Sequence, residues 1–215
     1  AWDVIAKSQK VRAANIRRYT VLEGAAGFNT HLFGIARTLV RAADEFAKPN
    51  EKRLSEFGES DKRSLELRLF SKRPIYKDFE TAKFADSLSW MCEILGYKDP
   101  LVQKVLSGKS PHVRAGEIVA ETKLWDVDER RKLYEGGKKA IAASTNSMIL
   151  LARLVDADSR KVRKILESQL EEPKRQAYDK IAKAKFAIEG TDTYPDATFT
   201  LRLSFGTCKG YVENG

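Results

Sequence analysis

The residues that could carry acid–base or nucleophilic chemistry are few and lie far apart in the sequence. The chain has two histidines, His31 and His112, and two cysteines, Cys92 and Cys208. His31, in the segment FNTHLFG, could act as a general base, but a structural or surface histidine is the more frequent case. His112 follows Pro111 in the first turn of a predicted helix, where a surface position is expected. Two histidines are too few for a histidine-built metal site and no CxxC spacing occurs, so no metal and no cofactor are expected.

The acidic residues are expected to serve structure rather than catalysis. Asp156 and Asp158 are predicted to cap a long helix and to complement its dipole. Ion pairs along one helix are predicted for four residues at three- and four-residue spacings, Arg37, Arg41, Asp44 and Glu45. The motifs GxSxG, HExxH, GxGxxG and the P-loop are all absent from the sequence. Residue types alone therefore predict a soluble, mainly helical domain that is not catalytic by itself.

Length and composition agree with a globular chain. The 215 residues are 42% hydrophobic and 32% charged, enough to bury a core without disulfides. No run approaches the roughly 18 apolar residues of a membrane span. The net charge of +9 would suit a nucleic-acid partner. However, the most basic stretch, 160–185, has only Tyr178 and the neighbouring Phe186 as aromatic residues, so a solvated helix face is expected there.

Apolar residues recur at spacings of three and four along most of the chain, which predicts helices throughout. The clearest case runs from Phe28 to Phe46 and has one wide apolar face. Cys92 lies in a similar pattern and is expected to be a buried small hydrophobe. Further helices are predicted over 2–22, 61–70, 76–95, 112–121, 127–134 and 148–155, with a last one over 156–188 bent at Pro173. Helix caps are predicted at Asp99, Ser110, Asp126 and within 144–147.

The period changes from helical to alternating near the end of the sequence. Apolar and polar residues alternate over 198–205, which predicts a half-buried β-strand. No comparable partner strand is evident, so its partners are expected in polypeptide outside this sequence or in another subunit. We therefore expect a helical domain over 1–190 and the start of a following β-segment over 191–215. The sequence has no signal-peptide pattern and starts inside a helical pattern. Both features are expected of a fragment.

The last segment also resembles a known family. Residues 194–206, YPDATFTLRLSFG, followed by the KGY-like 209–211, are similar to the bacterial serine dipeptidyl peptidases of serine peptidase family forty-six, the dipeptidyl-peptidase 7 and dipeptidyl-peptidase 11 type. Residues 27–54, 108–144 and 148–164 match the same family in order. The chain departs from the family pattern at Asn146-Ser147, where Asp-Pro is frequent, and at Cys208, where an apolar residue is expected.

The resemblance implies an exopeptidase with a chymotrypsin-like double β-barrel and a large helical insertion. The family's catalytic His and Asp precede the region matched here and its nucleophilic Ser follows it, so no catalytic residue is transferred to this chain. The residues that bind the free amino terminus of the substrate are also expected outside it. The helical insertion covers the active-site cleft, limits access so that dipeptides are released, and moves to open and close the cleft. The parent enzyme is expected to be periplasmic, cell-surface or secreted.

Our first hypothesis is thus a mainly α, multi-helix cap domain whose one C-terminal strand belongs to an adjoining barrel. Its expected partners are the rest of the parent peptidase and peptide substrates, without nucleic acid or a membrane span, and a homodimeric parent is left open. If any residues face substrate, they are expected near a helix start, at Asn29 and His31. The alternative is a non-catalytic basic helical module that binds nucleic acid or an acidic partner. An independent helical enzyme is disfavoured because no acid–base–nucleophile set is found.

Overall fold

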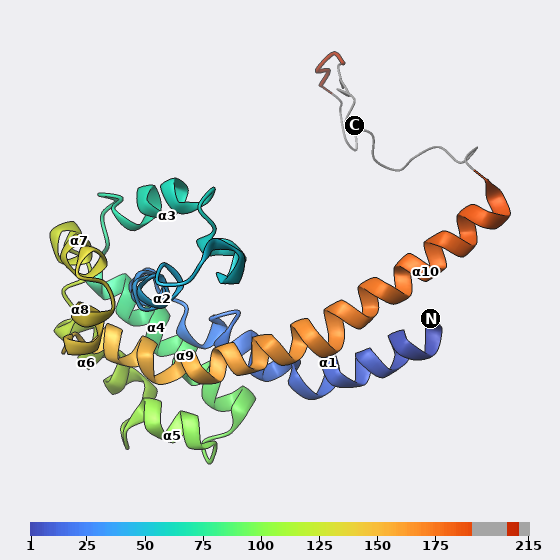
Figure 1. Cartoon of the computed structure of the whole chain (residues 1–215). Helices are drawn as coiled ribbons and strands as arrows, with labels where there is room; N and C mark the ends of the chain where they lie inside the picture. Colours follow the sequence, from blue (N-terminus) through green and yellow to red (C-terminus); the bar gives the residue numbers. More distant parts are fainter. Residues whose placement is uncertain (191–205, 211–215) are drawn as a thin grey trace.

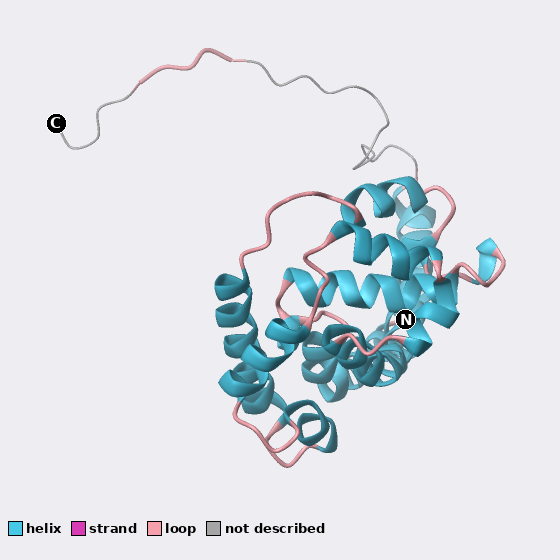
Figure 2. Ribbon diagram, turned by 90° about the vertical axis from the view of Figure 1, so that its left-hand side faces the viewer, coloured by secondary structure: helices cyan, strands magenta, loops and turns pink. Residues whose placement is uncertain are grey.

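The computed structural model describes residues 1–190 and 206–210, and every regular element in these two ranges is helical (Figures 1 and 2). The predicted mainly α class is therefore confirmed. The strand predicted over 198–205 lies outside the described residues. In chain order the elements are α1 (Trp2–Leu22), η1 (Ala26–Phe28), α2 (His31–Glu45), η2 (Asn50–Lys52), η3 (Ser55–Phe57), α3 (Lys62–Leu69), α4 (Lys77–Leu95), α5 (Pro100–Leu106), α6 (Pro111–Glu121), α7 (Val127–Glu135), α8 (Gly137–Ala143), α9 (Ser147–Leu166), the π-helical turn η4 (Glu167–Glu171) and α10 (Glu172–Glu189).

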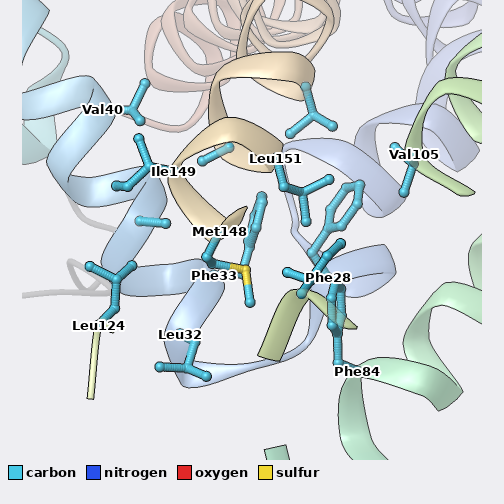
Figure 3. Close-up of a cluster of buried hydrophobic side chains, with 14 of the residues drawn as sticks. Phe28, Leu32, Phe33, Val40, Phe84, Val105, Leu124, Met148, Ile149 and Leu151 are labelled. Atoms are coloured by element: carbon cyan, nitrogen blue, oxygen red, sulfur yellow. The ribbon is translucent and has the colours of Figure 1, made fainter. Parts of the chain in front are cut away.

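The core lies where α2, α4, α6 and α9 pack against one another. The apolar face predicted for α2 is buried at Leu32, Phe33, Ala36, Leu39 and Val40. Figure 3 shows Leu32, Phe33 and Val40 beside Met148, Ile149 and Leu151 of α9, with Phe28 and Phe84 completing the cluster. The rings of Phe28 and Phe33 stack at 4.6 Å between centroids. Burial of each such side chain contributes about 1.5–3 kcal/mol, so this contact positions the start of α2 on α4 and α9.

Side-chain caps begin the helices where the sequence predicts them. Asp99 caps α5 and Ser110 caps α6, and each is followed by a proline in the first turn. The side chain of Asp126 accepts the Asp128 N–H and starts α7. Within 144–147 the cap is Asn146, whose amide oxygen accepts the N–H groups of Met148 and Ile149.

The cap predicted at Asp156 and Asp158 is wrong. Both residues lie in the middle of α9, which runs from Ser147 to Leu166 without a break. The Asp156 carboxylate is instead held by the guanidinium groups of Arg41 and Arg160. The Asp158 carboxylate lies 3.5 Å from the Arg18 guanidinium. These charges are compensated by arginines of α1, α2 and α9 itself, so they need no helix N-terminus.

A long rod formed by α9, η4 and α10 extends away from the other helices, and α1 lies beside it (Figure 1). We call α1 together with η4 and α10 the stalk, and α2 to α9 the body. Just before Pro173, where a bend is predicted, the rod changes to the π-helical turn η4. Pro173 has no N–H to donate to the preceding turn, which favours such a local change in helix type. Figure 1 shows that α1 begins and α10 ends at the same end of the stalk, remote from the body.

Within the described ranges, no single helix is long and apolar enough to cross a membrane. Among the described residues, only α8 and the long rod taken together have the length and apolar composition of a membrane span, and this pair is bent by 106°. The first turns of α9 in that pair supply buried core residues such as Met148 and Ile149.

Candidate functional site

A network of buried ion pairs joins the end of α1 to α2 and α9. At its centre Arg41 is 3% exposed. Its guanidinium donates to both carboxylate oxygens of Glu23, at 2.9 and 2.6 Å, and to Asp156 at 2.7 Å. Ser159 donates to Glu23 at 2.5 Å and accepts from Arg41 at 3.1 Å. The ion pairs predicted along one helix are therefore wrong for Arg41, which pairs with residues of two neighbouring elements.

The same network continues to Glu45, whose side chain is fully buried. The Glu45 carboxylate accepts from Arg160 at 2.5 Å, from Lys48 at 2.7 Å and from the Leu54 N–H at 2.9 Å. Asp44, also expected to pair within its helix, lies instead 3.0 Å from Lys138 of α8. Charges on α2 thus connect it to neighbouring elements.

Arg163 extends the network to the loop before α3. Its guanidinium binds both oxygens of Glu56, at 2.6 and 3.1 Å, and also contacts Glu23 and Glu167. Bidentate guanidinium–carboxylate pairs fix orientation as well as charge.

The electrostatics of the network keep its carboxylates ionised. Burial by itself raises the pKa of Glu23, but hydrogen bonds from Arg41 and Ser159 and the charges of Arg41 and Arg163 outweigh burial and lower the pKa to about 2. The pKa of Glu45 is lowered to about 2 as well, since hydrogen bonds from Lys48, Arg160 and the Leu54 N–H outweigh its burial. Carboxylates whose pKa lies this far below neutral pH are poor general bases. We therefore assign the network a structural role.

Asn29 and His31 lie exposed at the start of α2, on either side of its cap Thr30. Their backbones are fixed to α4: the Asn29 N–H donates to the Ser87 hydroxyl at 3.1 Å and the His31 N–H to the Glu80 carboxylate at 2.6 Å. Asn29 lines a shallow hollow, together with Gly24, Ala25, Ala26, Phe28, Thr30, Phe33 and Gly34. Two polar side chains thus lie on an anchored backbone, and no sequence pattern indicates the Glu80 and Ser87 contacts that anchor it.

Neither histidine is part of a catalytic arrangement in the portion that the structure describes. The imidazoles of His31 and His112 are on exposed residues. Neither ring hydrogen-bonds to a serine, a cysteine or a carboxylate of a described residue. No group of three His, Cys, Asp or Glu residues suited to a metal ion occurs among the described residues either. Cys92 is buried as predicted, and burial raises the pKa of its thiol.

A second hollow lies between α2, α3, α7 and α8, beside an aromatic cluster that the sequence analysis missed. Tyr134 packs edge-on against Phe46 and Phe70. Its hydroxyl donates to Glu66 at 2.8 Å, and burial together with this carboxylate raises the pKa of Tyr134. These residues come from distant parts of the sequence, so no local pattern could have indicated their meeting.

The basic stretch over 160–185 consists mostly of paired charges. Lys174, Arg175 and Lys183 each contact an acidic residue three or four positions away along η4 and α10. Arg160 and Arg163 are occupied by the buried network. This pairing favours the solvated-face interpretation over a nucleic-acid surface.

Fold and site together define a mainly helical domain that is held by buried ion pairs, with no nucleophile–base pair among its described residues. In a comparison with protein-family models, the family described as peptidase S46 matches residues 1–215. The chain therefore belongs to the peptidase S46 family, and the resemblance carried by the YPDATFTLRLSFG segment is confirmed. Family membership supports a dipeptidyl peptidase.

Proposed function

We propose that this chain is the helical cap over the active-site cleft of a serine dipeptidyl peptidase, which removes dipeptides from free peptide N-termini. In this proposal the catalytic triad lies outside the chain, and the chain alone is inactive. The cap limits which peptides reach the cleft.

The observation that carries the proposal is the state of the two histidines. A serine peptidase triad needs an imidazole hydrogen-bonded both to the nucleophilic hydroxyl and to a carboxylate. His31 and His112 are the chain's only histidines, and both are exposed without such partners among the described residues. The catalytic histidine of a peptidase in this family is then expected elsewhere in the parent enzyme.

The architecture supports a lid. A rigid body at one end of an extended two-helix stalk can move as a unit relative to whatever holds the other end (Figure 1). The Glu23–Arg41–Asp156 ion pairs join the end of the stalk helix α1 to α2 and α9, and so transmit such a motion to the body. A lid of this kind excludes water and commits bound substrate.

Asn29 and His31 are the side chains we propose to face the substrate. They are exposed and polar, and their backbones are fixed by Ser87 and Glu80. Amide and imidazole groups on an anchored backbone can hydrogen-bond an extended peptide without a large ordering cost.

The remaining parts of the proposal concern the parent enzyme. Residues 1–190 form the cap and 191–215 lead into the following barrel, where 198–205 pair as a strand. The partners are the rest of the peptidase and its peptide substrates, with a homodimeric parent left open, and the parent acts in the periplasm, at the cell surface or outside the cell.

The test compares dipeptidyl-peptidase activity of this chain with that of the longer peptidase containing it, on dipeptide reporter substrates. Activity in the longer enzyme and none in the chain is the expected result. Turnover by the isolated chain would overturn the claim that the triad lies elsewhere, and inactivity of both would refute the assigned reaction.

A further inference from the structure

The loop between α3 and α4 and the helix ends beside it carry exposed positive charge. Over residues 67–79, from the end of α3 to the first turn of α4, the chain has four basic residues, Arg68, Lys72, Arg73 and Lys77, and one acidic residue, Asp78. Lys72, Arg73 and Lys77 are exposed and form no ion pair with a described residue. They contrast with the basic stretch on α9 and α10, where most charges are paired.

The neighbouring α7 adds to this surface. The Arg131 guanidinium lies over the Phe70 ring at 4.3 Å, and the Lys77 ammonium lies over the Trp125 ring at 3.6 Å. Arg131 also has no carboxylate partner among the described residues, although Asp128 and Glu129 lie in the first turn of the same helix. These cation–π contacts hold two positive charges at fixed positions while leaving them open to solvent.

A buried arginine fixes the loop to α7. Arg130 is 1% exposed and donates to four backbone carbonyl oxygens, those of Leu69 (3.1 Å), Ser71 (3.0 Å), Leu124 (2.5 Å) and Trp125 (3.0 Å). The backbone that carries Lys72 and Arg73 is therefore tied to the segment that carries Trp125 and Arg131. A surface ordered in advance loses less conformational entropy when it binds a partner.

Two large aromatic side chains are exposed at the start of α4. Tyr76 is 64% exposed and Phe79 is 59% exposed. We call the whole surface the loop patch, defined by Lys72, Arg73, Tyr76, Lys77, Phe79 and Arg131. Aromatic and arginine side chains beside unpaired charges are typical of recognition surfaces.

We propose that the loop patch binds an acidic, extended peptide segment. Lys72, Arg73, Lys77 and Arg131 form no ion pair with a described residue, so a negatively charged partner would complement them. Nucleic acid fits less well, because base stacking needs free aromatic faces. Here the Trp125 face holds Lys77, and the rings of Phe70 and Phe79 carry Arg131 and Lys83. The carboxylates of an acidic peptide can be bound by the positive charges of the loop patch and by the phenol hydroxyl of Tyr76. The inference does not depend on the proposed cap function, since its test has no peptidase readout.

The test measures fluorescence anisotropy of a labelled ten-residue glutamate peptide titrated with the full chain, at low and physiological salt. The triple variant Lys72→Gln, Arg73→Gln, Lys77→Gln is compared with a charge-matched control, Lys161→Gln, Lys164→Gln, Lys180→Gln. The control residues are also exposed and without ion pairs to described residues, but lie on α9 and α10. Circular dichroism verifies that both variants keep their helix content.

We expect the wild-type chain to bind the glutamate peptide, more weakly as salt rises. The patch variant should weaken binding by about tenfold, and the control by less than about threefold. Equal losses in the two variants, or no binding by the wild type, would overturn the proposal. Tighter binding of a ten-residue thymidine oligonucleotide, lost in the patch variant, would overturn it in favour of a nucleic-acid surface.

Discussion

At the scale of single residues, the charges of this chain fall into two groups with different roles. The side chains of Arg41, Glu23, Asp156 and Glu45 belong to one largely buried ion-pair network that includes Arg160, whereas Lys72, Arg73 and Lys77 are exposed and form no ion pair with a described residue. A buried pair contributes little net stability when both partners are present, but removal of one partner leaves an uncompensated charge. Loss of one member of the first group is therefore expected to destabilise the body, whereas the second group is available for binding.

Arg41→Met should destabilise the chain strongly, because it leaves the carboxylates of Glu23 and Asp156 buried without their main partner. We expect a loss of about 3–5 kcal/mol in the free energy of unfolding, measured by urea titration with circular dichroism. Lys161→Met, at an exposed position on α9, is the matched control and should change the free energy by less than about 0.5 kcal/mol. A loss below about 1 kcal/mol for Arg41→Met would contradict the structural role of the network.

The network also predicts how stability depends on pH. The folded-state pKa values of Glu23 and Glu45 are about 2, below the ordinary value of 4.5. Because the unfolded chain takes up these protons first, the stability from both groups is fully present well above pH 4.5. It is lost progressively as the pH falls from about 4.5 towards 2.

Urea unfolding at several pH values between 2 and 7 measures this loss. The variant Glu23→Gln, Glu45→Gln is less stable at pH 7 and should show a shallower decline below pH 5. An equally steep decline in that variant would mean that other carboxylates dominate the acid sensitivity.

At the scale of elements, helix starts were predictable where a capping side chain and a proline stand together. Asp99-Pro100 and Ser110-Pro111 predict the starts of α5 and α6, because the capping side chain and the fixed φ angle of proline both act within one turn. The middle of α9 was not predictable in this way. Asp156 is of a residue type that often caps helices. Its position in the middle of α9 is stabilised by Arg41 of α2, which is distant in the sequence.

The candidate site also has one part that the sequence predicts and another that depends on packing between distant elements. The exposure of Asn29 and His31 next to the cap Thr30 follows from their place at a helix start, outside the apolar face of α2. Their attachment to Glu80 and Ser87 of α4 depends on how two helices pack, and no spacing in the sequence encodes it. The meeting of Phe46, Phe70 and Tyr134 is non-local for the same reason.

Asn146 provides a prediction at this scale. Its amide oxygen caps α9 and accepts a hydrogen bond from the Thr122 hydroxyl at 2.9 Å. Asn146→Ala should cost about 1–2 kcal/mol of unfolding free energy. Asn146→Asp keeps an acceptor at the same place and should cost less than half as much. Thermal or urea unfolding measures both, and an equal loss in the two variants would argue against capping as the cause.

At the scale of the whole molecule, a compact helical body is carried on a two-helix stalk (Figure 1), in a chain that belongs to the peptidase S46 family. The stalk is largely exposed: Ala177 is its one buried residue in α10, and Phe186 and Ile188 near its end are 60% and 85% exposed. Exposed apolar side chains at the end of a support are typical of a surface that another part of the protein covers. This arrangement fits a cap joined to a catalytic unit.

We propose that this chain controls access to a triad located elsewhere. The most direct test is steady-state kinetics of the longer peptidase with His31→Ala and His112→Ala, measured on a dipeptide reporter. Because these are the chain's only histidines, we predict that kcat stays within about tenfold of the wild type for both variants, with a raised KM for His31→Ala alone. A fall in kcat of a thousandfold or more in either variant, as expected when a triad histidine is removed, would contradict the account.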